Sequence, residues 1–156
     1  MKEKWIEKQG RWVIIFVKPN SPVRKRLNSF VRKGDRYVEK IRRGLELNFN
    51  ERIKIYFYHS LDEIERETGD RLSGWADIEN CAVHVVHTAK GSAFDEHELT
   101  HIIVEKTIGK PTTKILSEGM AEAMCDTWWG YKQDEWAVFY LKREKLLLPS
   151  KIYETA

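Results

Sequence analysis

The segment FDEHELTHIIVEK, residues 94–106, holds two histidines four positions apart and a glutamate directly after the first. Residues four apart in an α-helix project from the same face, so the imidazoles of His97 and His101 can share one metal ion. Glu98 lies about 100° round the helix from His97, close to such an ion but poorly placed to bind it. This pattern predicts a zinc site in which Glu98 is the general base for a metal-bound water.

A catalytic zinc ion takes three protein ligands and keeps one position open for water. The segment ILSEGMAEAM, residues 115–124, offers the third ligand. Glu118 follows His101 by seventeen residues, across a stretch with glycine and proline that predicts a turn between two helices. We therefore expect Glu118 to complete a site for one Zn²⁺ per chain.

Glu122 stands one helical turn after Glu118 on the same face. Metal-bound histidines usually donate their second ring N–H to a carboxylate or a carbonyl, and we expect Glu122 to accept it from His97. Gly119 has no side chain, and we expect it where the two helices approach closely.

The elements that must carry these residues follow from apolar periodicity and from capping and turn residues. Strands are predicted over 12–18, 52–59, 75–78 and 81–88, and the last two form a hairpin. Helices are predicted over 22–43, 61–68, 92–109, 117–128 and 134–145. The third helix is expected to begin at Ser92, with Asp95 completing a capping box, and to end at Gly109. The order begins with a βαβ unit and ends in helices. It predicts an α+β fold in which a mixed, twisted sheet carries packed helices.

The sequence HELTH followed by SEGMAE resembles the gluzincin family of zinc metallopeptidases, the thermolysin and aminopeptidase type. This resemblance covers residues 94–124 and implies a zincin-like fold in a compact single-domain form. It implies that His97, His101 and Glu118 bind zinc, that Glu98 is the catalytic base, and that Glu122 supports the site. The activity implied is that of a peptidase, a hydrolase that cleaves peptide bonds in a peptide or protein substrate.

Two further expectations come from this family. An extended substrate would lie along the predicted strand 81–88 as an added strand at the edge of the sheet. Larger members also carry a tyrosine or histidine that polarises the substrate carbonyl, and four residues stay open for that role: Tyr131, Tyr140, His84 and His87.

Length and composition predict one globular domain, residues 1–156, with 42% hydrophobic and 12% aromatic residues. Cys81 and Cys125 form no CxxC pair, which predicts reduced, buried thiols and a reducing compartment. No apolar run reaches the length of a membrane span. We expect a cytoplasmic protein.

The charge is unevenly distributed along the chain. Residues 1–55 hold 16 Lys and Arg against 6 Asp and Glu, whereas residues 56–156 hold 11 against 18. Such asymmetry can indicate a nucleic-acid partner. However, no aromatic residues alternate with the cations as single-strand binding requires. We expect neither a nucleic acid nor a membrane as partner.

Two alternatives stay open beside the peptidase. The chain could be a non-catalytic zinc- or peptide-binding domain of the same fold that lacks the carbonyl polariser. It could instead be a nucleic-acid-binding module that uses the basic helix 23–43. No pattern in the sequence indicates an oligomeric state.

Overall fold

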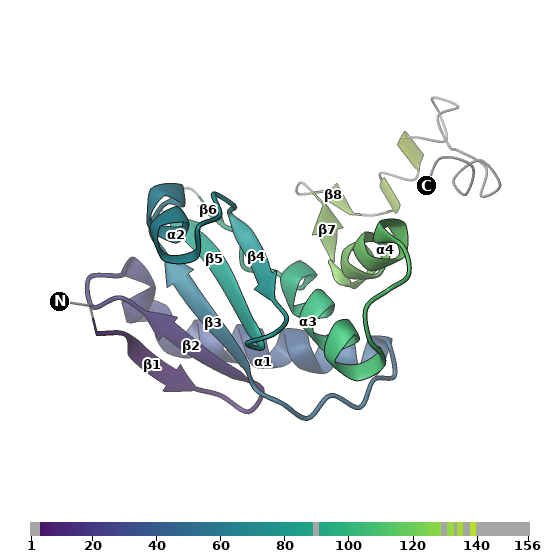
Figure 1. Ribbon diagram of the computed structural model, residues 1–156, viewed down its shortest axis with the longest axis horizontal. Helices are drawn as coiled ribbons and strands as arrows, with labels where there is room; N and C mark the ends of the chain where they lie inside the picture. Colours follow the sequence, from purple (N-terminus) through teal and green to yellow (C-terminus); the bar gives the residue numbers. More distant parts are fainter. Residues whose placement is uncertain (1–3, 89–90, 129–130, 133, 136–137, 140–156) are drawn as a thin grey trace.

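The computed structural model describes residues 4–88, 91–128, 131–132, 134–135 and 138–139. Within them the chain has the predicted α+β architecture, a mixed sheet with four α-helices (Figure 1). The strands are β1 (Ile6–Gln9), β2 (Val13–Val17), β3 (Ile53–Tyr58), β4 (Gly74–Asp77), β5 (Ala82–Thr88) and β6 (Gly91–Ser92). The helices are α1 (Leu27–Gly44), which continues a 3-10 helix (Pro22–Arg26), then α2 (Leu61–Thr68), α3 (His97–Ile108) and α4 (Lys114–Met124). A small hairpin follows, β7 (Thr127–Trp128) and β8 (Tyr131–Lys132).

The sheet has the strand order β1-β2-β3-β5-β4, and β6 also pairs with β5. Strands β2, β3 and β5 are parallel, and β1 and β4 add antiparallel edges. The predicted βαβ unit is therefore β2–α1–β3. The prediction that strand 81–88 forms the edge is wrong, because β5 is enclosed between β3 and β4. The edge on this side is β4, and pairing order of this kind is not encoded in local periodicity.

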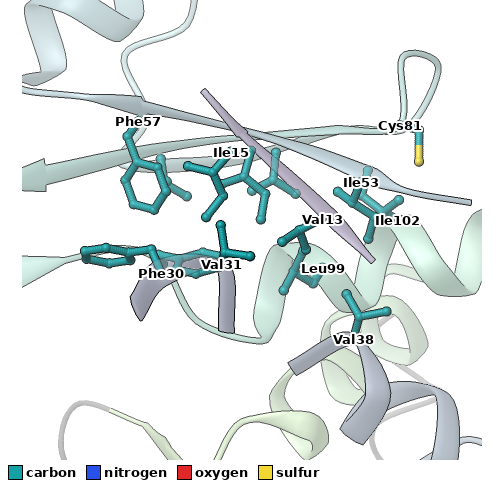
Figure 2. Close-up of a cluster of buried hydrophobic side chains, with 14 of the residues drawn as sticks. Val13, Ile15, Phe30, Val31, Val38, Ile53, Phe57, Cys81, Leu99 and Ile102 are labelled. Atoms are coloured by element: carbon teal, nitrogen blue, oxygen red, sulfur yellow. The ribbon is translucent and has the colours of Figure 1, made fainter. Parts of the chain in front are cut away.

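One face of the sheet carries the main hydrophobic core. Alternate residues of the central strands are fully buried against α1 and α3, as period-two alternation requires. Figure 2 shows side chains from both layers meeting, with Val38 of α1 and Leu99 and Ile102 of α3 pointing towards the sheet. Cys81 and Cys125 are buried cysteines that form no disulfide within the described residues, as predicted. No helix in the described ranges is both long and apolar enough to span a bilayer.

The opposite face of the sheet carries α2 and a row of aromatic rings. Ile64 of α2 packs on Tyr58 and Val86 at one end. Beside it a row crosses four strands in register: Phe16, Tyr56, His84 and Trp75. Successive ring centroids are 4.7, 5.0 and 5.0 Å apart, with interplanar angles of 13°, 11° and 30°. The rings therefore stack on one another.

Asp35 of α1 holds the turn between β1 and β2. Its carboxylate accepts hydrogen bonds from the backbone N–H groups of Arg11 (3.0 Å), Trp12 (2.7 Å) and Val13 (3.2 Å). A Cβ on Gly10 would lie 2.6 Å from the same carboxylate, so only glycine fits at this turn. One side chain thus fixes the edge hairpin to the helix beneath it.

Most predicted elements lie within two residues of the observed ones, but several differ, and the short strands β6, β7 and β8 were not predicted. Strand β1 was not predicted, because its sequence IEKQ is polar and mostly exposed. The helix predicted over 117–128 begins earlier, at Lys114, and ends at Met124, after which β7 starts. The helix predicted over 134–145 falls largely outside the described residues.

Candidate metal centre

The HELTH segment forms the first turn of α3. The prediction that this helix begins after Ser92 is wrong, because Ala93 N–H donates to Val86 O and continues the pairing of β6 with β5. Phe94 is buried in the core, and the helix begins only at His97, whose N–H donates to Asp95 Oδ1 (3.1 Å). Long-range strand pairing therefore sets where the helical turn that carries His97 and His101 starts.

Helix α4 runs beside α3, as Figure 1 shows, and its N-terminus is fixed by Thr113, whose hydroxyl accepts a hydrogen bond from Leu116 N–H. Ala121 is fully buried on its inner side. This packing turns three polar side chains of α4 towards α3: Ser117, Glu118 and Glu122. The facing sides of α3 and α4 thus bring together His97, His101, Glu118 and Glu122. Glu98, also on α3, points instead towards Gly74 of β4.

Three ligand atoms converge between the helices. His97 Nε2 lies 3.3 Å from His101 Nε2, Glu118 Oε2 lies 3.2 Å from His97 Nε2, and it lies 3.9 Å from His101 Nε2. In a tetrahedral site with metal–ligand bonds of about 2.0–2.1 Å, neighbouring ligand atoms are about 3.3–3.4 Å apart. Two of the three separations match that spacing and the third is about half an ångström longer. The donor set of two imidazoles and one carboxylate fits zinc.

The second ring nitrogen of each histidine also has a partner. With Nε2 unprotonated, His97 Nδ1–H donates to Glu122 Oε1 (3.2 Å), and His101 Nδ1–H donates to Ser117 Oγ (3.1 Å). Both imidazoles then point a lone pair at one spot beside the Glu118 carboxylate. Three electron-rich atoms this close repel one another unless a cation lies between them. Ser117 was not predicted from the sequence, although it directly precedes Glu118.

The environment of the site affects two of its titratable groups. Burial lowers the pKa of His101, and so does the neighbouring His97 ring, which keeps the His101 imidazole neutral and able to bind a metal. Burial raises the pKa of Glu98 above the usual range of a carboxyl group. Glu98 lies against β4, where a Cβ on Gly74 would be 3.2 Å from Glu98 Oε1.

A second group of possible ligands shares one residue with the first: His97, Glu122 and Cys125. The Cys125 thiol hydrogen-bonds to Ala121 O (3.4 Å), and burial raises its pKa to about 12. Zinc binds the thiolate, so this group would have to lose the thiol proton on binding, whereas neutral imidazoles and a carboxylate bind without losing one. The group that contains Glu118 therefore fits a metal better.

A pocket of about 350 Å³ opens beside the centre. It runs from the edge of the sheet to the end of α4, and its lining includes Gly74, His97, Glu98, Glu122 and Cys125. Among the three candidate ligands His97 lines this space, and Gly74 of the edge strand β4 lines it as well. A substrate placed there would contact Glu98 and His97 together.

Three candidate polarisers, His84, His87 and Tyr131, do not line this pocket, and the fourth is not described. His84 and His87 point to opposite faces of the sheet: Tyr58 OH hydrogen-bonds to His84 Nδ1 (2.8 Å), and His87 packs on Phe30. Tyr131 is 59% exposed, and Tyr140 lies outside the described residues. The prediction for Gly119 is wrong, because a Cβ there would meet no atom within 4 Å.

Compared with known proteins, the chain has no significant match among family models, curated protein sequences or solved structures. The chemistry of the centre is therefore inferred from its own residues.

Proposed function

We propose that the chain is a zinc-dependent hydrolase with a zincin-like core, and that it cleaves peptide bonds. The observation that carries this proposal is the convergence of His97, His101 and Glu118 at separations close to those of a tetrahedral zinc site. The orienting bonds from Glu122 and Ser117 support it, because partners of this kind set the tautomer of metal-binding histidines.

A divalent ion held by these three residues would lower the pKa of a bound water and polarise the substrate carbonyl. Glu98 supplies the proton transfers. Its carboxylate takes the proton of the attacking water and then passes it to the nitrogen of the departing amine. Because burial raises the pKa of Glu98, this group is suited to hold the proton between the two transfers.

The edge strand β4 is the proposed guide for the substrate. Among the described residues no strand pairs with its outer side, and its first residue, Gly74, lies against Glu98. An extended peptide that pairs with β4 would cross the pocket with its backbone beside the base. Backbone pairing gives affinity with little sequence selection, so we expect a peptide or protein substrate in extended form.

Metal content and three variants test this function. Elemental analysis of protein purified without added metal should give one zinc per chain. Glu98→Gln should keep zinc and fold but reduce turnover by about 100-fold or more, whereas His101→Ala and Glu118→Ala should lose zinc. Cleavage by Glu98→Gln at the parent rate would contradict the assigned base, and full zinc in Glu118→Ala would contradict the third ligand.

A peptide library separates the hydrolase from a binding domain. Zinc at one equivalent together with no cleavage of any library member would favour the non-catalytic zinc- or peptide-binding alternative. Cleavage that a chelator abolishes and added zinc restores would favour the hydrolase.

One observation favours a nucleic-acid partner as a second candidate. A depression of about 510 Å³ between β1 and the start of α1 is lined by five cations, Lys8, Arg24, Lys25, Arg26 and Arg32, and by no acidic residue. Within the stacked aromatic row, Tyr56 and His84 offer no base platform, because neighbouring rings cover both of their faces. Retention on DNA or RNA that falls steeply with salt and is lost on reversing Arg24, Lys25 and Arg26 would establish this role.

A further inference from the structure

Lys40 of α1 contacts one residue beside each of the two helices that carry the proposed metal-site residues. Its Nζ lies 2.9 Å from Glu96 Oε1 and 2.6 Å from Asp126 Oδ1. Glu96 directly precedes His97, and Asp126 lies two residues beyond the end of α4. One ammonium group therefore joins α1 to the start of α3 and to the end of α4.

The contact closes the open end of a helical hairpin. Helices α3 and α4 are connected by the loop 109–113, which fixes the end of α3 to the start of α4. The metal site lies towards the other end, where His97 begins α3 and Glu122 is in the last turn of α4. No covalent connection holds the helices together at that end. The ion pairs of Lys40 link the two helices there, in addition to the contact between His97 and Glu122.

The ion pair between Lys40 and Glu96 is buried on the Glu96 side. Only 4% of the Glu96 side chain is exposed, and a buried carboxylate needs a charged partner. The Glu96 carbonyl accepts hydrogen bonds from Thr100 N–H (2.9 Å) and Thr100 Oγ1–H (2.8 Å). Fixing Glu96 therefore fixes the first turn of α3, which carries His97.

The ion pair between Lys40 and Asp126 is exposed on the Asp126 side. The Asp126 side chain is 79% exposed, so its ion pair contributes little to the free energy of unfolding. Its neighbour Cys125 is buried, and Cys125 N–H donates to Glu122 O (3.0 Å). A restraint on Asp126 is therefore transmitted to the last turn of α4, where the side chain of Glu122 meets His97.

We propose that Lys40 is a positioning residue for the metal centre, which sets the distance between α3 and α4 through Glu96 and Asp126. This inference rests on the proposed function, because it takes His97 and Glu118 as ligands. Lys40 touches no ligand atom and acts only through the placement of the two helices. Loss of its exposed contact with Asp126 should weaken metal binding more than it weakens the fold.

The decisive variant is Asp126→Ala, with Asp62→Ala as matched control. Asp62 is also an exposed carboxylate in an ion pair, with Arg71, and it lies on α2 at the other face of the sheet. We expect Asp126→Ala to raise the zinc Kd about 10-fold in chelator competition. The melting temperature of the metal-free protein should stay within about 2 °C of the parent. Asp62→Ala should change neither quantity.

Lys40 itself is tested with two substitutions. Lys40→Met should raise the zinc Kd by about 10-fold or more, and Lys40→Arg, which keeps the charge, should restore most of the affinity. Adding Asp126→Ala to Lys40→Met should raise the Kd no further, because the two residues act through one contact.

The results separate this inference from the proposed function. A parent protein that binds no zinc overturns both. A parent that binds zinc, with Asp126→Ala and Lys40→Met binding it as tightly, overturns the positioning role alone. A fall in affinity that is matched by a fall in the metal-free melting temperature of Asp126→Ala would also overturn it, because the ion pair would then act on stability.

Discussion

Gly74 of β4 lies so close to Glu98 that a methyl group on Gly74 would be 3.2 Å from Glu98 Oε1. This contact places the proposed base beside the edge strand. Gly74→Ala should displace the Glu98 carboxylate by a few tenths of an ångström and reduce turnover about 10-fold, since proton transfer depends on hydrogen-bond reach. Zinc content should not change, because Glu98 is not among the proposed ligands. Steady-state kinetics with elemental analysis checks this, and an unchanged kcat would contradict it.

Cys125 should be dispensable for metal binding. It belongs to a possible ligand group with His97 and Glu122, but its pKa is raised to about 12 by burial. Cys125→Ser should therefore keep one zinc per chain, with an affinity within about threefold of the parent. The contrast is Glu118→Ala, which should lose the metal. Loss of zinc from Cys125→Ser would instead assign the metal to the group of His97, Glu122 and Cys125.

Gly119→Ala should stabilise the protein. Gly119 lies inside α4, is exposed, and has open space around its Cα. Alanine in a helix interior is favoured over glycine by about 0.5–1 kcal/mol. The opposite result is expected for Gly69, which ends α2 with φ of +87°, a conformation that alanine strains. Urea unfolding of both variants measures the two signs, and a destabilised Gly119→Ala would reveal an unseen contact.

Asp35→Ala should loosen the β1–β2 turn. Three backbone N–H groups lose their acceptor, and we expect the free energy of unfolding to fall by about 3 kcal/mol. Asp35→Asn keeps one acceptor oxygen and should lose less. Chemical denaturation of the metal-free protein compares the two.

His84 should make the metal-free protein sensitive to acid. Burial lowers the pKa of His84 in the folded state below the unfolded value of about 6.5. Between these two values the unfolded chain binds more protons, so the free energy of unfolding falls as the pH drops below about 6.5. His84→Asn, which keeps an acceptor for Tyr58, should reduce this loss. Urea titrations at pH 7.5 and pH 5.0, with a chelator present, measure the loss of the free energy of unfolding for the parent and the variant. An equal loss in both proteins would show that His84 does not contribute.

Local patterns were sufficient to predict most of the elements. Alternating burial marks β2 and β3, and Ser21 and Gly69 act as caps where the sequence places them. The spacing of the two histidines also directs them to one face of α3, as a helix requires.

Features set by long-range pairing could not be predicted. The start of α3 depends on Ala93 pairing with β5. The edge of the sheet depends on β4 pairing with the outer side of β5. Lys40 meets Glu96 and Asp126 across sequence separations of 56 and 86 residues. Its spacing within α1 gives no sign of either partner, because local periodicity only shows that the residue faces partly outward.

The shortness of β4 limits how much of a bound polypeptide the molecule can read. Four residues at a rise of about 3.3 Å each offer about 13 Å of backbone, enough for roughly four residues of an added chain. If the edge is used as proposed, recognition would cover a short stretch around the scissile bond. Longer and shorter chains that share this stretch would then be bound with similar strength.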